Sequence, residues 1–542
     1  MRHFAFDQFP TSCFSGTAAM VIFEWIVALL LAAVILSGIA RWAGAPYPAF
    51  LALGGAALAF LPGGPRLTLE PDFALALFVA PVLLDAAYDA SPRDLKDNWA
   101  PVAGLVLIAV GATTAAAAFV AHSLAPGLPW AAAIALGAVV APPDAAAATA
   151  VLRQVRLPYR ILTILEGESL LNDAGALLIY RLAVGAVLAG GAFSVRDVAP
   201  TFLLGVAGSI VAGPVLAWLY LRLVRYLADD APSQIILQFV GTFGVWMLAE
   251  RIGLSGVLTI VCYAIAIARE APDRTPARLR VPAYAVWETA VFVLNVLAFV
   301  LIGLQIRPTL ENLNPAQRIE YLTVAGAVLA TVIVVRIAWV MTYNTAARLK
   351  VRAFGFHPPR PMLAPTVRGG LIISWCGMRG IVTLAAAFAL PAGSGDGTGE
   401  FPFRDLIVLT AFCVVLGTLV IQGLTLRPLL RFLDLHDDDP VGREVALARS
   451  AAFRAALEAL DGDESAEARS LRKEYATVLR QAEDGPDGDV PASLPGDALR
   501  RRAIAAARTV VSDLRQRGEI GDDAFHHIEE ELDWAELSAS PR

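Results

Sequence analysis

The sequence predicts an all-α polytopic membrane protein with about thirteen transmembrane helices and a helical tail outside the membrane. Of its 542 residues, 57% are hydrophobic and only 17% are charged, whereas soluble domains carry about 25% charged residues. The mean hydropathy is +0.61. Apolar runs of about 18 to 24 residues recur from about residue 21 to residue 433, and each is long enough to cross a bilayer as a helix.

Short loops that contain Gly and Pro separate the expected spans. Residues 1–21 form an N-terminal segment, which we expect outside the cytosol. The apolar run after Met20 is too long for a signal-peptide core and lacks a convincing cleavage site, so it is the first span; both Met1 and Met20 are candidate start residues. The spans are predicted at residues 22–40, 46–62, 72–89, 99–122, 129–152, 159–190, 198–225, 234–252, 254–269, 284–306, 321–345, 367–391 and 405–432.

Basic residues concentrate in alternate loops, which predicts the orientation. One set of loops holds Arg41, Arg93, Lys96, Arg153, Arg156, Arg160, Arg222, Arg225, Arg269, Arg274, Arg278, Arg280, Arg348, Lys350, Arg352, Arg360 and Arg368. The other set holds only Arg66, Arg196, Arg251, Arg307, Arg318 and Arg404. Because cytoplasmic loops carry the excess of Lys and Arg, the first set is cytoplasmic. The N-terminus then lies outside and the C-terminus in the cytosol, which requires an odd number of spans.

The composition changes sharply at about residue 436. The following segments are charged and amphipathic, and the loop DGPDGDVPASLPGD interrupts them. We therefore expect residues 22–435 to form the transmembrane domain and residues 436–542 a cytosolic helical tail with a role in regulation or assembly. No basic stripe indicates nucleic acid as a partner. The four cysteines are scattered, and we interpret them as packing residues rather than metal ligands or disulfides.

Among the ionisable residues inside predicted spans, five stand out; charges are costly there, and each is a functional candidate. They are Asp85 in the third span, Asp144 in the fifth, Glu168 and Asp173 in the sixth, and Arg336 in the eleventh. A single buried carboxylate is as readily a hydrogen-bonded structural group as a functional one. Carboxylates on three spans favour an ion pathway.

The fifth predicted span is interrupted by prolines in GAVVAPPDAAAATAV. Pro142 and Pro143 each remove a backbone donor, so the carbonyls of Ala138 and Val139 lose their helical partners. Unpaired carbonyls at membrane depth are tolerated only where they are buried in protein or line a watery cavity. A simple proline kink is the alternative. Together with Asp144, free carbonyls predict a site for a hard monovalent cation.

The sixth predicted span contains LEGESLLNDAGALLIY. Ser169 and Asp173 are four residues apart and therefore share a helix face. A hydroxyl and a carboxylate one turn apart can hold a small cation, and the same carboxylate can instead take a proton. This competition is the minimum that exchange of a cation for protons requires.

A second interruption is predicted in the twelfth span, SWCGMRGIVTLAAAFALP, where Gly377 and Gly380 flank Arg379. The fifth and twelfth spans are equivalent positions if spans 1–6 and 8–13 are inverted repeats. Broken helices in corresponding halves indicate the binding site of a transporter.

Four segments carry a resemblance to a known family: GAVVAPPDAAAA, EGESLLNDAGALLIY, VWETAVFVLNVLAFVLIGLQI and CGMRGIVTLAAAFALP. Together they resemble the sodium/proton exchanger branch of the monovalent cation:proton antiporters (cation:proton antiporter 1 family, bacterial type), over about residues 22–435. The resemblance implies a homodimer in the bacterial inner membrane, with a dimerisation domain and a six-helix core in which two broken helices cross near the ion. It implies a transporter rather than an enzyme, without a cofactor, whose substrates are Na⁺ or K⁺ and H⁺.

Matched by motif, the resemblance makes Asp173 the central ion- and proton-binding aspartate and Asp144 the acid of a threonine-aspartate motif. Ser169 matches a neighbouring hydroxyl ligand. Asn172 matches the asparagine before the central aspartate, where the related electrogenic branch has a second aspartate. Because an amide does not titrate, we expect electroneutral exchange of one cation for one proton.

Two positions depart from the family pattern. Asp85 stands where many members have a glutamate. Pro143 replaces the threonine of the threonine-aspartate motif, so only its carbonyl can be a ligand, which leaves the ion preference open. Glu168 and Arg336 match a pair that braces the core, with Arg379 as the alternative partner.

Three other functions are compatible with parts of this pattern. Exchange of K⁺ rather than Na⁺ for H⁺ is the nearest alternative. Intramembrane aspartyl proteases also need two aspartates, and they resemble one another in a Gly-x-Gly-Asp motif. Neither candidate aspartate lies in such a motif, because Asp144 follows Pro-Pro and Asp173 follows Leu-Asn. A cation channel would need a continuous filter of carbonyls or a ring of acids, and neither is visible.

Overall fold

The computed structural model describes residues 16–43, 47–61, 71–144, 158–188, 195–227, 230–275, 277–311, 313–355, 364–391, 401–435, 440–484, 497–517, 519, 528 and 531–537. Every regular element in these residues is a helix. The chain divides into two compact units, Met1–His436 and Asp437–Arg542. The predicted loops and half-helices that fall between these ranges, including residues 145–157, lie outside the described residues.

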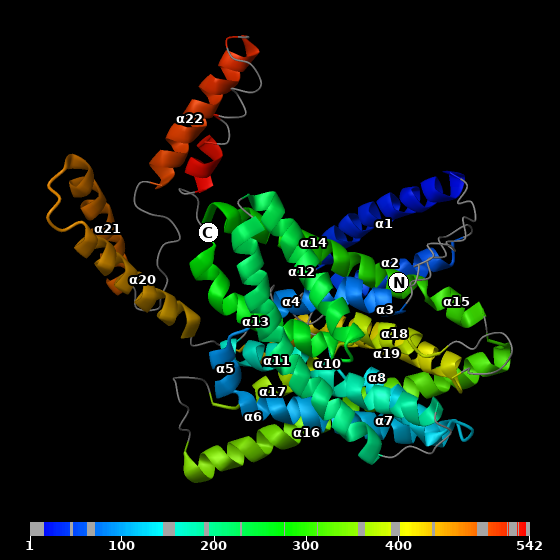
Figure 1. The fold of residues 1–542 in the computed structure, drawn as a ribbon. Helices are drawn as coiled ribbons and strands as arrows, with labels where there is room; N and C mark the ends of the chain where they lie inside the picture. Colours follow the sequence, from blue (N-terminus) through cyan, green and yellow to red (C-terminus); the bar gives the residue numbers. More distant parts are fainter. Residues whose placement is uncertain are drawn as a thin grey trace, which may run out of the picture. The chain divides into compact units, whose positions relative to one another are not determined.

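The first unit holds the apolar helices (Figure 1). Its N-terminal part comprises α1 (Gly16–Ala43), α2 (Tyr47–Ala59), α3 (Pro71–Ala74), the π-helical η1 (Leu75–Val79), α4 (Ala80–Asp89), α5 (Pro92–Asp97), α6 (Trp99–Ala103), the π-helical η2 (Gly104–Ala109), α7 (Val110–Leu124) and α8 (Trp130–Val140). It continues with α10 (Tyr159–Leu188), α11 (Val195–Leu227), α12 (Ala231–Arg251), α13 (Gly256–Arg274), α14 (Ala277–Leu304), α15 (Ile306–Glu311), α16 (Pro315–Phe354), α17 (Val367–Trp375), α18 (Ile381–Phe388) and α19 (Arg404–Leu433).

The second unit consists of amphipathic helices, drawn in orange to red in Figure 1. They are α20 (Pro440–Ala459), α21 (Ala466–Asp484) and α22 (Asp497–Gln516). α20 and α21 pack together, and the rings of Phe453 and Tyr475 lie 5.4 Å apart between them. Arg508 of α22 forms ion pairs with Asp533 and with Glu536, the latter at 2.8 Å.

Seven helices among the described residues are long and apolar enough to cross a membrane. Each of the thirteen predicted ranges contains a described helix, but several of these helices are short or interrupted. The seven are Trp99–Leu124, Tyr159–Leu188, Leu204–Tyr226, Ala231–Arg251, Leu279–Glu311, Pro315–Phe354 and Arg404–Leu433. The structure is therefore that of a polytopic membrane protein, and the count of thirteen spans stays a prediction.

The helix ends differ from the predicted spans where local capping extends a helix past its apolar part. α16 has 40 residues because a capping box between Asn314 and Gln317, with Pro315 in the first turn, starts it before the apolar run. The short helix α5 was not predicted; the Ser91 hydroxyl caps it by accepting a hydrogen bond from the Asp94 N–H. Hydropathy detects only the apolar part of a helix, so it misses such ends.

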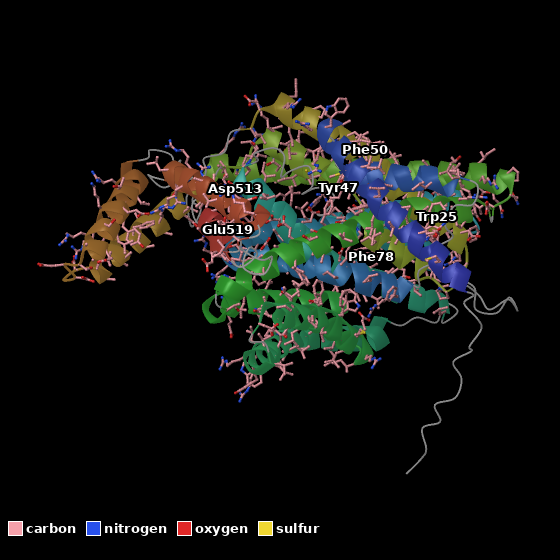
Figure 2. The ribbon with its side chains drawn as sticks, turned by 90° about the horizontal axis from the view of Figure 1, so that it is seen from above. Trp25, Tyr47, Phe50, Phe78, Asp513 and Glu519 are labelled. Atoms are coloured by element: carbon pink, nitrogen blue, oxygen red, sulfur yellow. The ribbon has the colours of Figure 1, made fainter. Side chains whose placement is uncertain are left out.

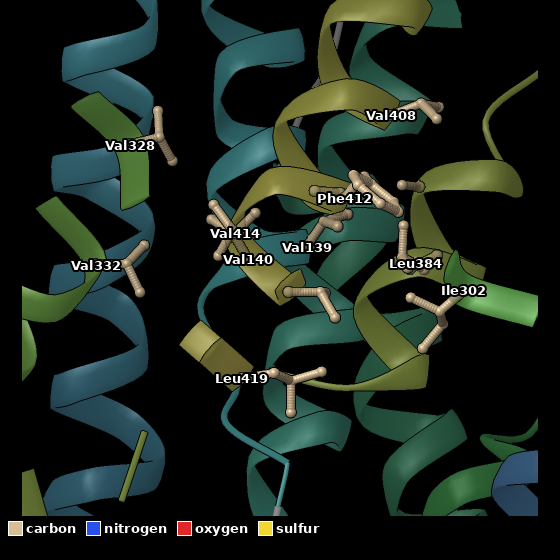
Figure 3. Close-up of a cluster of buried hydrophobic side chains, with 14 of the residues drawn as sticks. Val139, Val140, Ile302, Val328, Val332, Leu384, Val408, Phe412, Val414 and Leu419 are labelled. Atoms are coloured by element: carbon tan, nitrogen blue, oxygen red, sulfur yellow. The ribbon is translucent and has the colours of Figure 1, made fainter. Parts of the chain in front are cut away.

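Close helix contacts in the first unit depend on small residues, as expected where lipid leaves little hydrophobic driving force between helices. α2 and α14 meet at Gly55 and Gly303, where an added Cβ would overlap backbone atoms of the facing helix. α1, which carries Trp25, packs against α2 and α14 (Figure 2). A buried apolar cluster joins α8 to α19, with Val139 and Val140 near Phe412 (Figure 3). This cluster supports the end of α8.

Candidate ion-binding site

The first interruption begins where α8 ends at Val140. Residues 141–144 are not helical, and Ala141, Pro142 and Pro143 are buried. Proline lacks an N–H, so the helical hydrogen-bond ladder stops here as predicted from the two prolines. The backbone N–H of Asp144 donates instead to the carbonyl of Met378, at 2.7 Å. The segment after α8 is therefore bonded to the interruption between α17 and α18.

The second interruption separates α17 from α18 at residues 376–380, all of which are buried. Gly380 is the N-cap residue of α18. A Cβ at Gly380 would overlap the Asp144 carboxylate and lie only 2.7 Å from the Asp144 Cβ, so this position has no room for a side chain. The carboxylate thus sits beside the N-terminus of α18, where the helix dipole is positive and favours a negative charge.

Arg379 is fully buried and covers the open end of α8. Its Nε donates to the Val140 carbonyl at 3.0 Å and its Nη2 to the Ala141 carbonyl at 3.1 Å. Its Nη1 donates to the carbonyl of Gly377. Its backbone N–H donates to the Thr418 hydroxyl at 3.0 Å. The guanidinium group thus donates to the last carbonyls of α8. In a continuous helix the Asp144 N–H would pair with the Val140 carbonyl, but it donates to Met378 instead.

Arg336 and Glu168 form a buried, bidentate salt bridge between α16 and α10. Arg336 Nη1 donates to Glu168 Oε1 at 2.5 Å, and Nη2 donates to Oε2 at 2.8 Å. Arg336 Nη2 also donates to the carbonyls of Ile373 and Cys376 at 3.1 and 3.3 Å, which covers the end of α17. Each interruption therefore has its own arginine. Of the two arginines that the sequence offered as partners of Glu168, the structure places Arg336 against it.

Two of the predicted ligands on α10, Asn172 and Asp173, lie close to the first interruption. Asn172 is fully buried, and its Nδ2 donates to the Pro143 carbonyl at 2.8 Å. This bond fixes the amide orientation, since the carbonyl only accepts. Among the described residues, Asn172 Oδ1 is buried without a hydrogen-bond partner. Asp173 is buried and close enough to Asp144 for their charges to interact; Ser169, one turn earlier, is half-buried.

Asp85 lies away from the other predicted ligands. It lines a cavity of about 540 Å³ between α4, α12 and α14, together with Tyr88, Arg280 and Glu288. None of the other predicted ligands lines this cavity. The structure therefore brings together Asp144 and Asp173 with Asn172 and Pro143, and it places Asp85 on the wall of a polar cavity.

Sequence reasoning missed three contacts at the crossing. The Met378 carbonyl and the guanidinium of Arg379 hold the two interruptions together, and the Thr418 hydroxyl joins the second interruption to α19. The two glycines around Arg379 were a signal of the second interruption. Nothing in the local sequence indicates that Arg379 reaches α8, because that contact joins residues 239 positions apart.

The end of α8 meets the break between α17 and α18 inside an apolar helix bundle, with carboxylates at the meeting point. This arrangement is typical of one class of protein, ion-coupled membrane transporters. Comparison with known proteins identifies the family. Residues 26–432 match the family described as "Sodium/hydrogen exchanger, transmembrane". The chain belongs to this sodium/hydrogen exchanger family, whose members are transporters and not enzymes.

Similar proteins occur in bacteria and archaea. The chain is 30% identical to an "Uncharacterized Na(+)/H(+) exchanger YjcE" of Escherichia coli, over 91% of this chain and 93% of the relative. It is 30% identical to a "Sodium, potassium, lithium and rubidium/H(+) antiporter" of Bacillus pumilus, over 80% of this chain and 65% of that relative. The solved structure of the sodium proton antiporter MjNhaP1 from Methanocaldococcus jannaschii superposes with a TM-score of 0.58 and 19% identity, covering 77% of this chain and 99% of that one. This last likeness shows the fold.

Proposed function

We propose that this cation:proton antiporter exchanges Na⁺ for H⁺ across the bacterial plasma membrane by alternating access, with the cation and the proton competing for Asp173. One observation carries the proposal: Asp173 is buried within interaction range of Asp144, where the end of α8 meets the break between α17 and α18. Two neighbouring carboxylates repel each other in a low-dielectric site. Either a cation or a proton relieves that repulsion, which makes the two forms alternatives.

The ligands that we assign to the cation are side-chain oxygens. Asp173 and Asp144 supply charge, Ser169 supplies a hydroxyl, and Asn172 supplies Oδ1, which is buried without a hydrogen-bond partner among the described residues. The Pro143 carbonyl is a weaker candidate than the sequence indicated, because it already accepts from the Asn172 amide. A carbonyl has two lone pairs, so it retains one for an ion.

Asp85 has a more distant role in this proposal. It lines the polar cavity beside α4, where a carboxylate raises the local concentration of cations. Glu168 and Arg336 brace the core and take no part in ion binding.

A K⁺/H⁺ exchanger is the second candidate. The name of the Bacillus pumilus relative includes potassium, lithium and rubidium. The proline at position 143 also removes a hydroxyl that the family pattern places near the ion, which favours less strict selection by size.

Ion-driven proton flux in proteoliposomes tests the proposal. Purified protein is reconstituted with a pH-sensitive dye inside, and equal pulses of Na⁺, Li⁺ and K⁺ are added outside. We expect a proton flux with Na⁺ and a smaller one with K⁺. A larger response to K⁺ would support the second candidate, and no response to any of the three would contradict antiport of these ions.

We further propose a homodimer with the N-terminus outside and residues 436–542 in the cytosol. The distribution of basic residues among the loops supports this orientation. A reporter fused to the C-terminus should be active only in the cytosol; activity confined to the periplasm would reverse the orientation.

A further inference from the structure

A second cavity in the first unit differs in character from the ion site. It has a volume of about 740 Å³ and lies between the N-terminal ends of α10 and α17 and the C-terminal half of α16. Its floor is apolar, formed by Leu105, Ile161, Ile164, Val340 and Ile373. None of the proposed cation ligands lines it.

The rim of this cavity carries positive charge. Arg160 and Arg368 both line it. Arg160 Nε donates to Asn98 Oδ1 at 3.2 Å, and Arg368 Nη1 donates to the Leu433 carbonyl at 3.1 Å. Both of these acceptors are neutral groups. One acid, Asp434, also lines the cavity, and the two arginines outnumber it.

Two further features of the rim favour an anionic, membrane-embedded ligand. The N-terminus of α17 opens onto the cavity at Thr366 and Val367, and helix N-termini favour anions. Trp339 and Tyr343 line the wall on successive turns of α16, with ring centroids 6.5 Å apart. Trp and Tyr are enriched at the depth of lipid headgroups.

We propose that this cavity binds an anionic phospholipid. The phosphate would lie between Arg160 and Arg368 at the N-terminus of α17, and an acyl chain would lie along the apolar floor. The positive charge of the rim complements the anionic headgroup, and the apolar floor complements the acyl chain. In the predicted orientation the cavity opens toward the cytosolic leaflet, where anionic lipids meet basic residues. A free phosphate shares the headgroup chemistry but gains nothing from the floor.

The bound lipid would stabilise the helices that carry the ion site. Ile373, at the floor, is the residue whose carbonyl accepts from Arg336. The walls of the cavity therefore belong to the same helices, α10, α16 and α17, that the Glu168–Arg336 salt bridge joins. A ligand that contacts all three raises the stability of the folded state by mass action.

Thermal unfolding of the full chain in detergent tests the proposal with four additions: none, dioleoylphosphatidylglycerol, dioleoylphosphatidylcholine and inorganic phosphate. Two variants perturb the site. Arg160→Gln with Arg368→Gln removes its charge, and Ala347→Phe fills the cavity while it keeps both arginines. The matched control is Arg222→Gln with Arg225→Gln, which removes two exposed arginines near the end of α11.

We expect phosphatidylglycerol alone to raise the unfolding temperature of the unmodified protein and of the control. Its half-saturating concentration should rise about tenfold or more in both site variants. The proposal would be overturned if phosphatidylglycerol stabilised the control and both site variants equally. It would also be overturned if the control lost as much of this stabilisation as the arginine variant. Stabilisation by phosphate alone would assign the site to a free anion. If the arginine variant does not fold, the response of Ala347→Phe decides.

Discussion

The buried arginines decide which groups remain available for an ion. Arg379 occupies the carbonyls of Val140 and Ala141, and Arg336 occupies those of Ile373 and Cys376. A guanidinium at an open helix end supplies donors that the interrupted ladder lacks, and it also balances negative charge nearby. These four carbonyls at the ends of α8 and α17 are therefore bonded to arginine, which is why our proposal assigns the cation mainly to side chains.

The salt bridge between Glu168 and Arg336 supports this arrangement, and we predict that it is structural. Glu168→Gln or Arg336→Gln alone leaves a buried partner unpaired, which typically costs about 3–5 kcal/mol. Each single variant should therefore unfold at a lower temperature and transport more slowly. Thermal unfolding and proteoliposome flux measure both effects.

A double-mutant cycle checks that the two losses come from one interaction. The double variant should be more stable than the sum of the single losses predicts, because neither charge is then left alone. Additive losses would show that the two residues act independently and would remove the salt bridge from the account.

At the scale of the helices, the crossing depends on the absence of a side chain at Gly380. A Cβ there would overlap the Asp144 carboxylate. We predict that Gly380→Ala displaces Asp144 and lowers transport by about tenfold or more, since small displacements of a reacting group have large effects. Gly326→Ala on α16 is the control, because an added Cβ at Gly326 meets no atom within 4 Å.

Initial rates of Na⁺-driven proton flux for the two alanine variants give the comparison. Gly326→Ala should transport at the normal rate. A fully active Gly380→Ala protein would mean that the close approach of α18 to Asp144 is not needed for function.

The end of α8 and the break between α17 and α18 could be predicted from the sequence, and their causes are local. Pro142 and Pro143 must end α8, and glycines at 377 and 380 mark a second break, so both follow from residue types alone. The hydrogen bonds of Arg379 to the carbonyls of Val140 and Ala141 could not be predicted. These residues are distant in sequence, and a bond to a backbone carbonyl does not depend on the type of residue that carries it. The position of Asp85 was equally hidden: hydropathy places it in a span but does not say which helices face it.

For the whole molecule, we predict that exchange is electroneutral. Asn172 does not titrate, so Asp173 alone alternates between a protonated and a cation-bound form, and the moving core carries the same charge in both directions. Asp144 stays charged in this scheme beside the N-terminus of α18. The membrane potential should then do no work on the cycle.

Proteoliposomes with a potassium/valinomycin potential check this stoichiometry. The Na⁺ gradient at equilibrium should not change when the potential is imposed. A shift with voltage would mean that more than one proton moves for each cation, and Asp144 would be the first residue to test for the second proton.

In the proposed mechanism Asp173 carries both the cation and the proton, and Na⁺-driven proton flux through Asp173→Asn tests this assignment most directly. This substitution keeps the shape of the side chain and removes both its charge and its proton. We predict a protein that inserts and folds but transports neither Na⁺ nor H⁺, with Asp144→Asn nearly as impaired and Asp85→Asn less so. Normal Na⁺-driven proton flux from a folded Asp173→Asn protein would contradict the account.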